Sequence, residues 1–383
     1  MLCASFWGHN LLRVLYLGMH FGGSYNSPSH EALQARSLAE MGHDVTFVVN
    51  QPPPWKKPNP PKLHEIVLPV DEALQRGRYD LLQPMVGDDF DVAFASSASG
   101  APFLASWKRS TGRPAVTQVL DFPMWRLKID GGPWRDQWRP WFQALGAMDQ
   151  VVFNTNVNRV HAESACKIYG KDVGFLGSPK VVYYGIDTEA IDEALAAPGA
   201  ARISGAPFQC CSTSRLVFYK GFDFGIMGLS RVAAHERPAY AIVGEGEDHA
   251  RLAQMASLLD VNVGFAGGCS DFEKGMIMKG SSFGLALAWN PEIPYQCPGE
   301  VVYSGRPCII ADTAINRERY GNHGVTYVDP FDPVVVGAAV TDIVRAGPPN
   351  GYDAKREAAW IKEHRSFRSH AEGVVEVLEN VTR

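Results

Sequence analysis

The feature that most constrains the fold is an alternation of short apolar runs with helix-length amphipathic stretches, and it occurs twice along the 383 residues. The apolar runs lie at 11–17, 45–49, 66–70, 92–95, 115–120 and 151–153, and then at 208–211, 239–243, 261–265, 283–288, 308–310 and 325–328. Nearly continuous apolar strands separated by helices are typical of parallel sheets covered on both faces. The sequence therefore predicts an α/β chain with two Rossmann-like domains facing a central cleft, where ligands bind at the carboxyl ends of strands.

The predicted boundaries follow the places where this alternation pauses. Residues 1–10 are a ragged leader that lacks the basic start of a signal peptide. Residues 11–186 form the first domain, and 187–206, rich in small residues, Pro and Gly, form a linker. Residues 207–350 form the second domain, and 351–383 continue as helix without a following strand. The length also predicts two domains, at roughly 150 residues each.

Composition excludes several classes of protein. An apolar fraction of 46% is enough to form a packed core, which rules out a disordered chain. No apolar run approaches the ~18 residues of a membrane-spanning helix. The seven cysteines include no CxxC pair, which predicts reduced thiols in a cytoplasmic protein. No His or carboxylate cluster has metal-ligand spacing, so we expect no metal. A net charge of −5 gives no global attraction to nucleic acid or anionic membranes.

Charged residues and glycines follow the predicted strands of the second half in a fixed order. Arg215 and Lys220 come after its first strand, a Gly-rich turn at 243–246 comes after the second, and Glu292 and Glu300 come after the fourth. Two nearby cations suit a pyrophosphate, and glycines at helix starts let backbone N–H groups approach phosphate oxygens. Each feature alone is ordinary surface chemistry. Their order and spacing together predict a nucleoside-diphosphate site, with carboxylates for the sugar hydroxyls.

These pieces resemble the nucleotide-binding domain of the retaining GT-B glycosyltransferases of family 4. The matching segments are STSRLVFYKGFDFGI, AIVGEGEDHARL, VGFAGG, EIPYQCPGE, VVYSGRPCII and YVDPFDP. The first half resembles the family more loosely, through RVLYLGMHFGGSYN, LAEMGHDVTFVVN, and VVFNTNVNRV followed by VVYYGID. The resemblance implies a GT-B fold whose C-terminal helix crosses back to the first domain. It also implies transfer of a sugar with retention from a nucleoside-diphosphate sugar, without a metal or other cofactor.

The resemblance further implies roles for individual residues. Arg215, Lys220 and Glu292 would be the catalytic set, in which the cations hold the diphosphate and Glu292 contacts the transferred sugar. Glu300 would accept from the ribose hydroxyls, and the backbone near Gly267 would line the base pocket. The implied donor-binding residues are Gly22, Gly23, Arg215, Lys220, Gly244, Gly268, Tyr295, Gln296, Cys297 and Glu300.

Two positions depart from the family pattern. Residues 293–295 are Ile-Pro-Tyr where the family usually has Gly-Phe-Gly, and Pro294 offers no N–H. The donor sugar is therefore held differently or is a different sugar. Leu120 stands where relatives have a histidine that reaches the sugar, often near its 6-hydroxyl. Either the donor lacks a polar C6 substituent, or Asp121 or His20 takes this role.

A Trp- and Arg-rich segment in the first half is the candidate acceptor surface. Four of the nine Trp residues lie close together: Trp125, Trp134, Trp138 and Trp141. Residues 105–145 carry seven Lys and Arg against three Asp. The spacing of the last three Trp indicates one helical face packed on the core. Alternatively, Trp and Arg stack on sugars or bases, or lie at a membrane interface. Asp121, Trp125 and Arg126 are the acceptor-binding candidates.

The acceptor stays open among a saccharide, a lipid-linked acceptor, a small molecule and modified nucleic acid, with peripheral membrane contact also open. Two other activities remain as alternatives. One is a GT-B phosphorylase or sugar-nucleotide epimerase, and the other is a non-catalytic protein that binds a sugar nucleotide.

Overall fold

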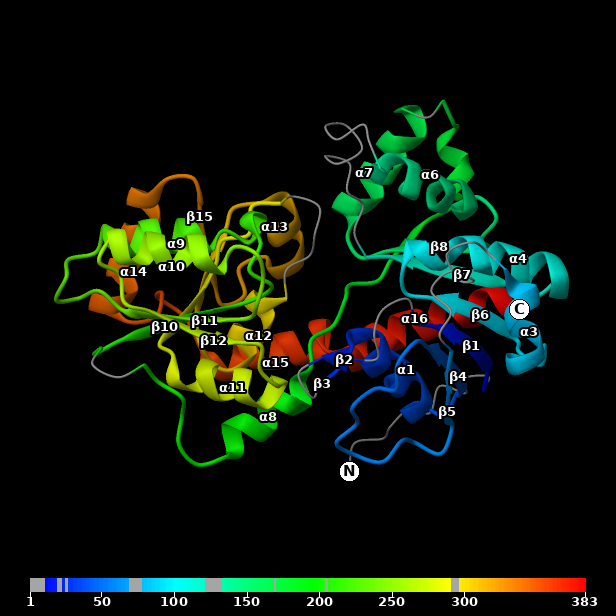
Figure 1. Cartoon of the computed structure of the whole chain (residues 1–383), viewed down its shortest axis with the longest axis horizontal. Helices are drawn as coiled ribbons and strands as arrows, with labels where there is room; N and C mark the ends of the chain where they lie inside the picture. Colours follow the sequence, from blue (N-terminus) through cyan, green and yellow to red (C-terminus); the bar gives the residue numbers. More distant parts are fainter. Residues whose placement is uncertain are drawn as a thin grey trace. The chain divides into compact units, whose positions relative to one another are not determined.

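Parallel strands form two separate sheets, each in its own unit of the chain (Figure 1). The computed structural model describes residues 11–18, 23–24, 27–68, 78–120, 133–168, 170–203, 206–290 and 296–383. Unit 1 comprises Met1–Val182 with His370–Arg383, and unit 2 comprises Tyr183–Ser369. Within the described ranges, none of the helices is both long and apolar enough to span a bilayer. The leader predicted at 1–10 lies outside the described residues.

Unit 1 has a seven-stranded sheet in the order β5-β4-β1-β6-β7-β8-β9, and a short hairpin, β2-β3. The strands are β1 Arg13–Leu17, β2 Gly23–Ser24, β3 Ser27–Pro28, β4 Asp44–Val49, β5 Leu63–Val67, β6 Val92–Ala95, β7 Ala115–Val119, β8 Gln150–Phe153 and β9 Lys180–Val181. The helices are α1 His30–Glu40, α3 Tyr79–Val86, η1 Ala98–Gly100, α4 Ala101–Thr111, α6 Pro133–Leu145, α7 Asn156–Ile168, η2 Val173–Leu176 and α16 Phe367–Thr382. All pairings within the seven-stranded sheet are parallel, as the apolar strands predict, and the β2-β3 hairpin is antiparallel.

Side chains of β1 alternate between two buried layers because successive residues of a strand point to opposite faces. Val14 and Tyr16 pack in the layer that contains α1 and α16. Leu15 and Leu17 pack in the layer that contains α3 and α4. Both faces of the sheet are therefore covered, which explains the nearly continuous apolar run in the sequence.

Helix α16 closes the core of unit 1 although it lies far from the rest of the unit in sequence. It contributes the buried side chains Ala371, Val374, Val375, Val377 and Leu378. The ring of His370 is hydrogen-bonded to Gln34 of α1. The Gln34 amide also donates to Gln118 of β7 over 3.4 Å. In Figure 1 the red helix lies along the blue and cyan strands. The predicted return of the C-terminal helix to the first domain is confirmed.

Unit 2 has a six-stranded sheet in the order β12-β11-β10-β13-β14-β15. The strands are β10 Gln209–Thr213, β11 Ala239–Val243, β12 Val263–Gly267, β13 Phe283–Ala286, β14 Cys308–Ala311 and β15 Val325–Val328. The helices are α8 Thr188–Ala196, η3 Phe218–Lys220, α9 Phe222–Ser230, α10 His249–Leu258, α11 Asp271–Gly280, α12 Cys297–Tyr303, α13 Ala314–Tyr320, α14 Pro333–Ala346 and α15 Ala354–Arg365. All its strand pairings are parallel.

The two faces of this sheet again form two cores. Cys210 and Tyr240 point into a core formed with α9, α10 and α14. Cys211 and Ala241 point into a core formed with α8, α11, α12 and α15. Figure 1 shows these two sets of helices on opposite sides of the strands. Both vicinal cysteines are buried and free, so they serve as small apolar side chains.

The segment predicted as a linker, 187–206, instead contains helix α8 within unit 2. Ile191 and Ala194 of α8 are buried, and Ala194 lies against Gly275 of α11. The helix begins after Asp187, whose Oδ1 accepts from the backbone N–H groups of residues 189 and 190. The flanking Gly and Pro suggested a loop, but an acidic N-cap followed by good helix formers forms a helix. The chain divides after Val182.

Candidate functional site

The sequence-predicted residues of the second half gather at one edge of the unit 2 sheet. Parallel strands end at the same edge, and the strand order reverses between β10 and β13. Arg215 and Lys220 follow β10, Gly244 follows β11, and Gly268 follows β12. Glu300 lies on α12, which comes after β13. In open α/β sheets such a reversal is the usual ligand site, so these residues occupy the expected position.

The Gly-rich turn after β11 supports the loop that carries Arg215. A Cβ atom on Gly244 would lie 1.9 Å from the carbonyl oxygen of Ser214, and Gly244 has φ +132°. A Cβ atom on Gly246 would lie 2.2 Å from the carbonyl oxygen of Leu216. The Leu216 N–H also donates to the carbonyl of Glu245 over 2.8 Å. Only glycines allow the two loops to approach this closely.

Two backbone N–H groups at this edge already have partners within unit 2. The Gly244 N–H donates to the Gly267 carbonyl over 2.8 Å. The Gly268 N–H donates to the Glu245 carboxylate over 3.2 Å. These N–H groups are bonded within the edge of the sheet, so they do not point freely at a phosphate. The glycines shape the edge by letting neighbouring backbone segments pack.

Arg215 and Lys220 flank a single fixed aromatic ring. Tyr219 is buried, and its hydroxyl accepts from Arg215 Nη2 over 3.2 Å. Lys220 Nζ lies 5.7 Å from the centroid of the same ring. Gly221 follows with φ +70°, and a Cβ atom there would lie 2.1 Å from the Leu287 carbonyl oxygen. This tight turn holds the backbone next to Lys220 beside the end of β13.

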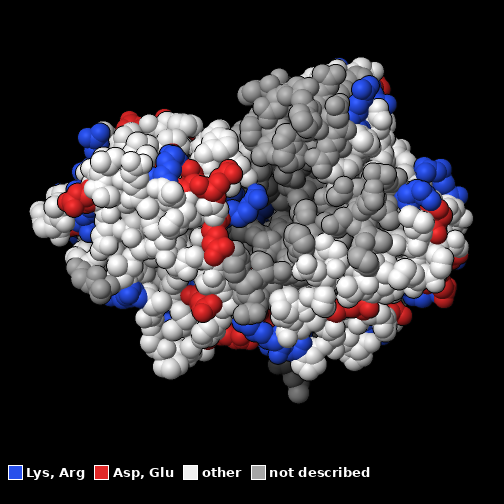
Figure 2. Space-filling model, in the orientation of Figure 1, with Lys and Arg blue, Asp and Glu red and all other residues white. Residues whose placement is uncertain are grey.

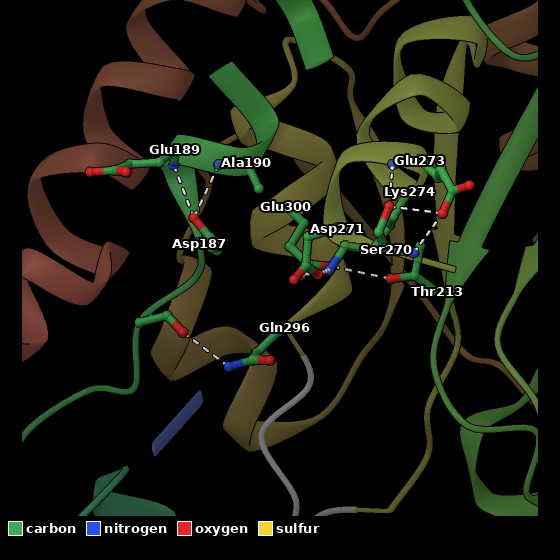
Figure 3. A network of polar contacts seen from close by, with 11 residues as sticks. Asp187, Glu189, Ala190, Thr213, Ser270, Asp271, Glu273, Lys274, Gln296 and Glu300 are labelled. Atoms are coloured by element: carbon green, nitrogen blue, oxygen red, sulfur yellow. Dashed lines mark hydrogen bonds and ion pairs between the residues drawn. The ribbon is translucent and has the colours of Figure 1, made fainter. Parts of the chain in front are cut away.

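Glu300 is buried and oriented through both carboxylate oxygens (Figure 3). Thr213, the last residue of β10, donates from Oγ1 to Oε2 over 3.1 Å. Lys274 of α11 donates from Nζ to Oε1 over 2.7 Å. Sequence reasoning missed both partners. Thr213 is the second residue of the recognised segment STSRLVFYKGFDFGI and could have been noticed, whereas nothing in the sequence pairs Lys274 with a residue on a different helix.

The side chains of two predicted donor-binding residues make other contacts in unit 2. Gln296 Nε2 donates to the Gly185 carbonyl over 2.9 Å (Figure 3). Cys297 is buried in the core shared with α11 and α12. Gly23 lies in the β2-β3 hairpin. The predicted site residues outside the described ranges are Gly22, Asp121, Trp125, Arg126, Glu292 and Tyr295.

The position of the missing family histidine lies at the carboxyl end of β7. Leu120 follows this strand, and its carbonyl accepts from the side-chain amides of Asn154 and Asn158, over 3.3 and 3.0 Å. Both asparagines are buried, and sequence reasoning missed them. They fix the backbone at Leu120. His20 and Asp121, the two candidate substitutes for the histidine, lie outside the described residues.

The Trp- and Arg-rich segment is described only in part. Helix α6 contains its second half, and Trp141 is half-buried against the core that includes Phe142 and Leu145. Core packing therefore accounts for Trp141, while the side chains of Trp134 and Trp138 lie outside the described set. On the face drawn in Figure 2, the described basic and acidic side chains are interspersed rather than separated into fields of one sign. Among the described residues, His, Cys, Asp and Glu form no group of three that could hold a metal ion.

Asp187 provides a stability prediction. Burial raises its pKa from 3.8 to about 6, and this effect outweighs the hydrogen bond from the Ala190 N–H, which lowers the pKa. Between about pH 4 and pH 6 the folded protein therefore binds a proton that the unfolded chain does not, so the free energy of unfolding falls as pH rises through this window. A shift of this size is worth about 2–3 kcal/mol. Asp187→Asn keeps the N-cap and should remove this slope. Urea unfolding of both proteins at about pH 4.5 and about pH 7 measures the free energy of unfolding at each pH. If this free energy changes equally with pH in the wild type and in Asp187→Asn, the assignment is wrong.

Comparisons with known proteins identify the architecture. No protein-family model matches the sequence, and no curated protein matches it significantly. Among solved structures, HepE from Anabaena in complex with UDP and glucose is 15% identical, covering 96% of this chain and 99% of its own, with a TM-score of 0.71. Sucrose-phosphate synthase from Thermosynechococcus elongatus is 10% identical, covering 96% and 98%, with a TM-score of 0.74. A glycosyltransferase from Rickettsia africae is 14% identical, covering 97% and 99%, with a TM-score of 0.69. These similarities show that the chain has a GT-B fold.

Proposed function

We propose that this chain is a retaining glycosyltransferase that uses a nucleoside-diphosphate sugar. The observation that carries the proposal is the placement of Arg215 and Lys220 around one ring at the point where the strand order of the unit 2 sheet reverses. Arg215 follows strand β10, and the last residue of that strand, Thr213, orients the carboxylate of Glu300. The fold supports the proposal, since HepE was solved with UDP and with UDP-glucose.

The two cations supply the electrostatics that this reaction needs. As the bond between the sugar C1 and the diphosphate oxygen breaks, negative charge grows on the leaving diphosphate. Fixed positive groups stabilise a charge that develops in the transition state more than they stabilise the ground state. Arg215 and Lys220 would neutralise this charge without a metal ion. Glu300 would accept hydrogen bonds from the ribose hydroxyls, and Glu292 would contact the transferred sugar.

Retention follows if the acceptor attacks from the face that the diphosphate leaves. The acceptor oxygen forms its bond to C1 on that same face, and its proton passes to an oxygen of the departing diphosphate. The products are the glycosylated acceptor and a nucleoside diphosphate. The donor oxygen thus serves as the base, and no enzymic nucleophile is required.

A panel of nucleotide sugars tests this function. The donors carry UDP or GDP and a hexose, deoxyhexose or pentose, and release of free nucleoside diphosphate is followed with and without EDTA. Without an acceptor we expect slow hydrolysis of one donor that is insensitive to EDTA. A suitable acceptor should accelerate release of the nucleoside diphosphate by taking the sugar, and NMR should show a product with the donor's anomeric configuration. An inverted product would overturn the retaining mechanism, and dependence on a divalent ion would overturn metal independence.

The altered turn at 293–295 favours one alternative, a protein that binds a sugar nucleotide without turning it over. In that case the nucleotide raises the melting temperature, but no donor is consumed with saccharide, lipid-linked or nucleic-acid acceptors. A clear preference for glucose as the donor sugar would overturn the interpretation of Leu120 as a sign of a sugar without a polar C6 group. If no nucleotide stabilises the protein, both the transferase and the binding protein are wrong.

A further inference from the structure

We propose that Lys274 is a positioning residue of the donor site, which orients the Glu300 carboxylate so that the site selects a ribonucleoside over a deoxyribonucleoside diphosphate. The inference rests on the proposed function, because it assumes that Glu300 meets the ribose. Lys274 itself would not touch the donor.

The geometry places Lys274 as a bridge between two carboxylates. Its Nζ lies 2.7 Å from Glu300 Oε1 and 2.7 Å from Asp271 Oδ1 (Figure 3). The side chains of Lys274 and Glu300 are only 15% and 7% exposed. Helix α11 is fixed at its start by a capping box between Ser270 and Glu273. The ammonium therefore comes from a rigid first turn of the helix.

A buried carboxylate needs such a partner. Without a counter-ion, a buried acid avoids the desolvation cost by taking up a proton. Burial alone would lower the pKa of Lys274, but Glu300 and Asp271 outweigh burial and hold it above its usual range. Lys274 thus stays charged at neutral pH and balances the charge on Glu300. Burial also protects this ion pair from screening by salt.

The orientation of Glu300 leaves acceptor capacity on both oxygens. Each carboxylate oxygen has two lone-pair directions. Among the described residues, Lys274 uses one on Oε1 and Thr213 uses one on Oε2, which leaves one on each oxygen for a vicinal diol. A ribose presents two neighbouring hydroxyls that can donate to these positions. A protonated carboxyl would replace one acceptor with a donor, and a deoxyribose would leave one acceptor unmatched.

A competing explanation is that the pair only ties α11 to α12. Lys279 offers the matched control because it is a half-buried lysine of the same helix with a structural role: its Nζ donates to the carbonyl of Leu195 over 2.9 Å, at the end of α8. Lys279→Met should lower stability without changing the recognition of the sugar. A purely structural Lys274 would behave in the same way.

Isothermal titration of the full chain with UDP and GDP, and with their 2′-deoxy forms, measures the selectivity. The 2′-deoxy form lacks one hydrogen bond to the charged carboxylate. The wild-type protein should therefore bind the preferred ribonucleotide about ten-fold more tightly than its 2′-deoxy form. In Lys274→Met this ratio should fall to about two-fold or less, whereas Lys279→Met should keep the wild-type ratio. If Lys274→Met does not fold, Lys274→Gln removes the charge and keeps a donor, and it should also lose most of the ratio.

Each negative result of this experiment contradicts a different claim. A folded Lys274 variant that keeps the wild-type ratio overturns the role of Lys274 and leaves the proposed function standing. A wild-type protein that binds ribo- and deoxyribonucleotides equally overturns the role of Glu300 in selection. A wild-type protein that binds no nucleoside diphosphate at all overturns the proposed function itself.

Discussion

Replacing Lys220 by alanine is expected to lower the rate of glycosyl transfer by about two to three orders of magnitude. Lys220 ends the short helix η3, and the left-handed Gly221 directly after it is packed against the Leu287 carbonyl. The backbone that carries Lys220 is therefore fixed before the donor arrives, so little backbone reorganisation is needed as charge develops on the diphosphate. The substitution should reduce kcat more than it raises KM for the donor, because the interaction strengthens in the transition state.

Two variants provide the comparison for Lys220. Lys355→Ala removes an exposed lysine at the start of α15 and should leave turnover unchanged. Arg215→Ala should have a smaller effect than Lys220→Ala, because Arg215 is exposed and its charge is better screened by solvent. Steady-state kinetics with the preferred donor give all three values. Turnover of Lys220→Ala within about three-fold of the wild type would remove Lys220 from the reaction.

Replacing Gly244 by alanine is expected to destabilise unit 2 by several kcal/mol. The new Cβ atom would lie 1.9 Å from the Ser214 carbonyl oxygen, and a backbone atom cannot move aside as the end of a flexible side chain can. The φ of +132° adds strain for any residue other than glycine. Because Ser214 precedes Arg215, the displaced loop should also move one of the two cations, so donor affinity falls even in the folded fraction.

Gly347→Ala separates the clash from the backbone strain. Gly347 has φ +81°, but a Cβ atom there would meet nothing within 4 Å. Its ψ of −162° lies in a region that essentially only glycine adopts, so the substitution should cost about 1–3 kcal/mol of backbone strain with no clash. Urea unfolding of both variants measures the difference. If Gly244→Ala is no less stable than Gly347→Ala, the loops can separate easily, and the turn does not position Arg215.

The strands were predictable because they are buried on both faces. Val92–Ala95 and Ala239–Val243 are apolar throughout and are strands with the expected bounds. Helix α8 was missed because its flanking glycines and prolines outweighed a short helical pattern. Its stability comes from packing on α11, which a local reading of the sequence does not include.

The site was predictable in its order but not in its contacts. Arg215, Lys220, Gly244 and Glu300 could be identified because each directly follows a strand or belongs to a known spacing. Lys274 could not, because its contact with Glu300 depends on how two helices lie on one face of the sheet. The packing role of the glycines was also missed. Their lack of side chains serves the packing of loop against loop, and this is visible only in three dimensions.

The placement of α16 has a consequence for folding during synthesis, because this helix belongs to unit 1 but follows unit 2 in the sequence. Unit 2 is continuous in sequence, so it can complete its core as soon as residue 369 has left the ribosome. Unit 1 needs residues 370–383, which emerge only after the whole of unit 2. Until then the side of its sheet that carries Val14 and Tyr16 lacks part of its apolar cover. Because exposed apolar surface favours aggregation, truncation before α16 should yield aggregates rather than a smaller stable protein.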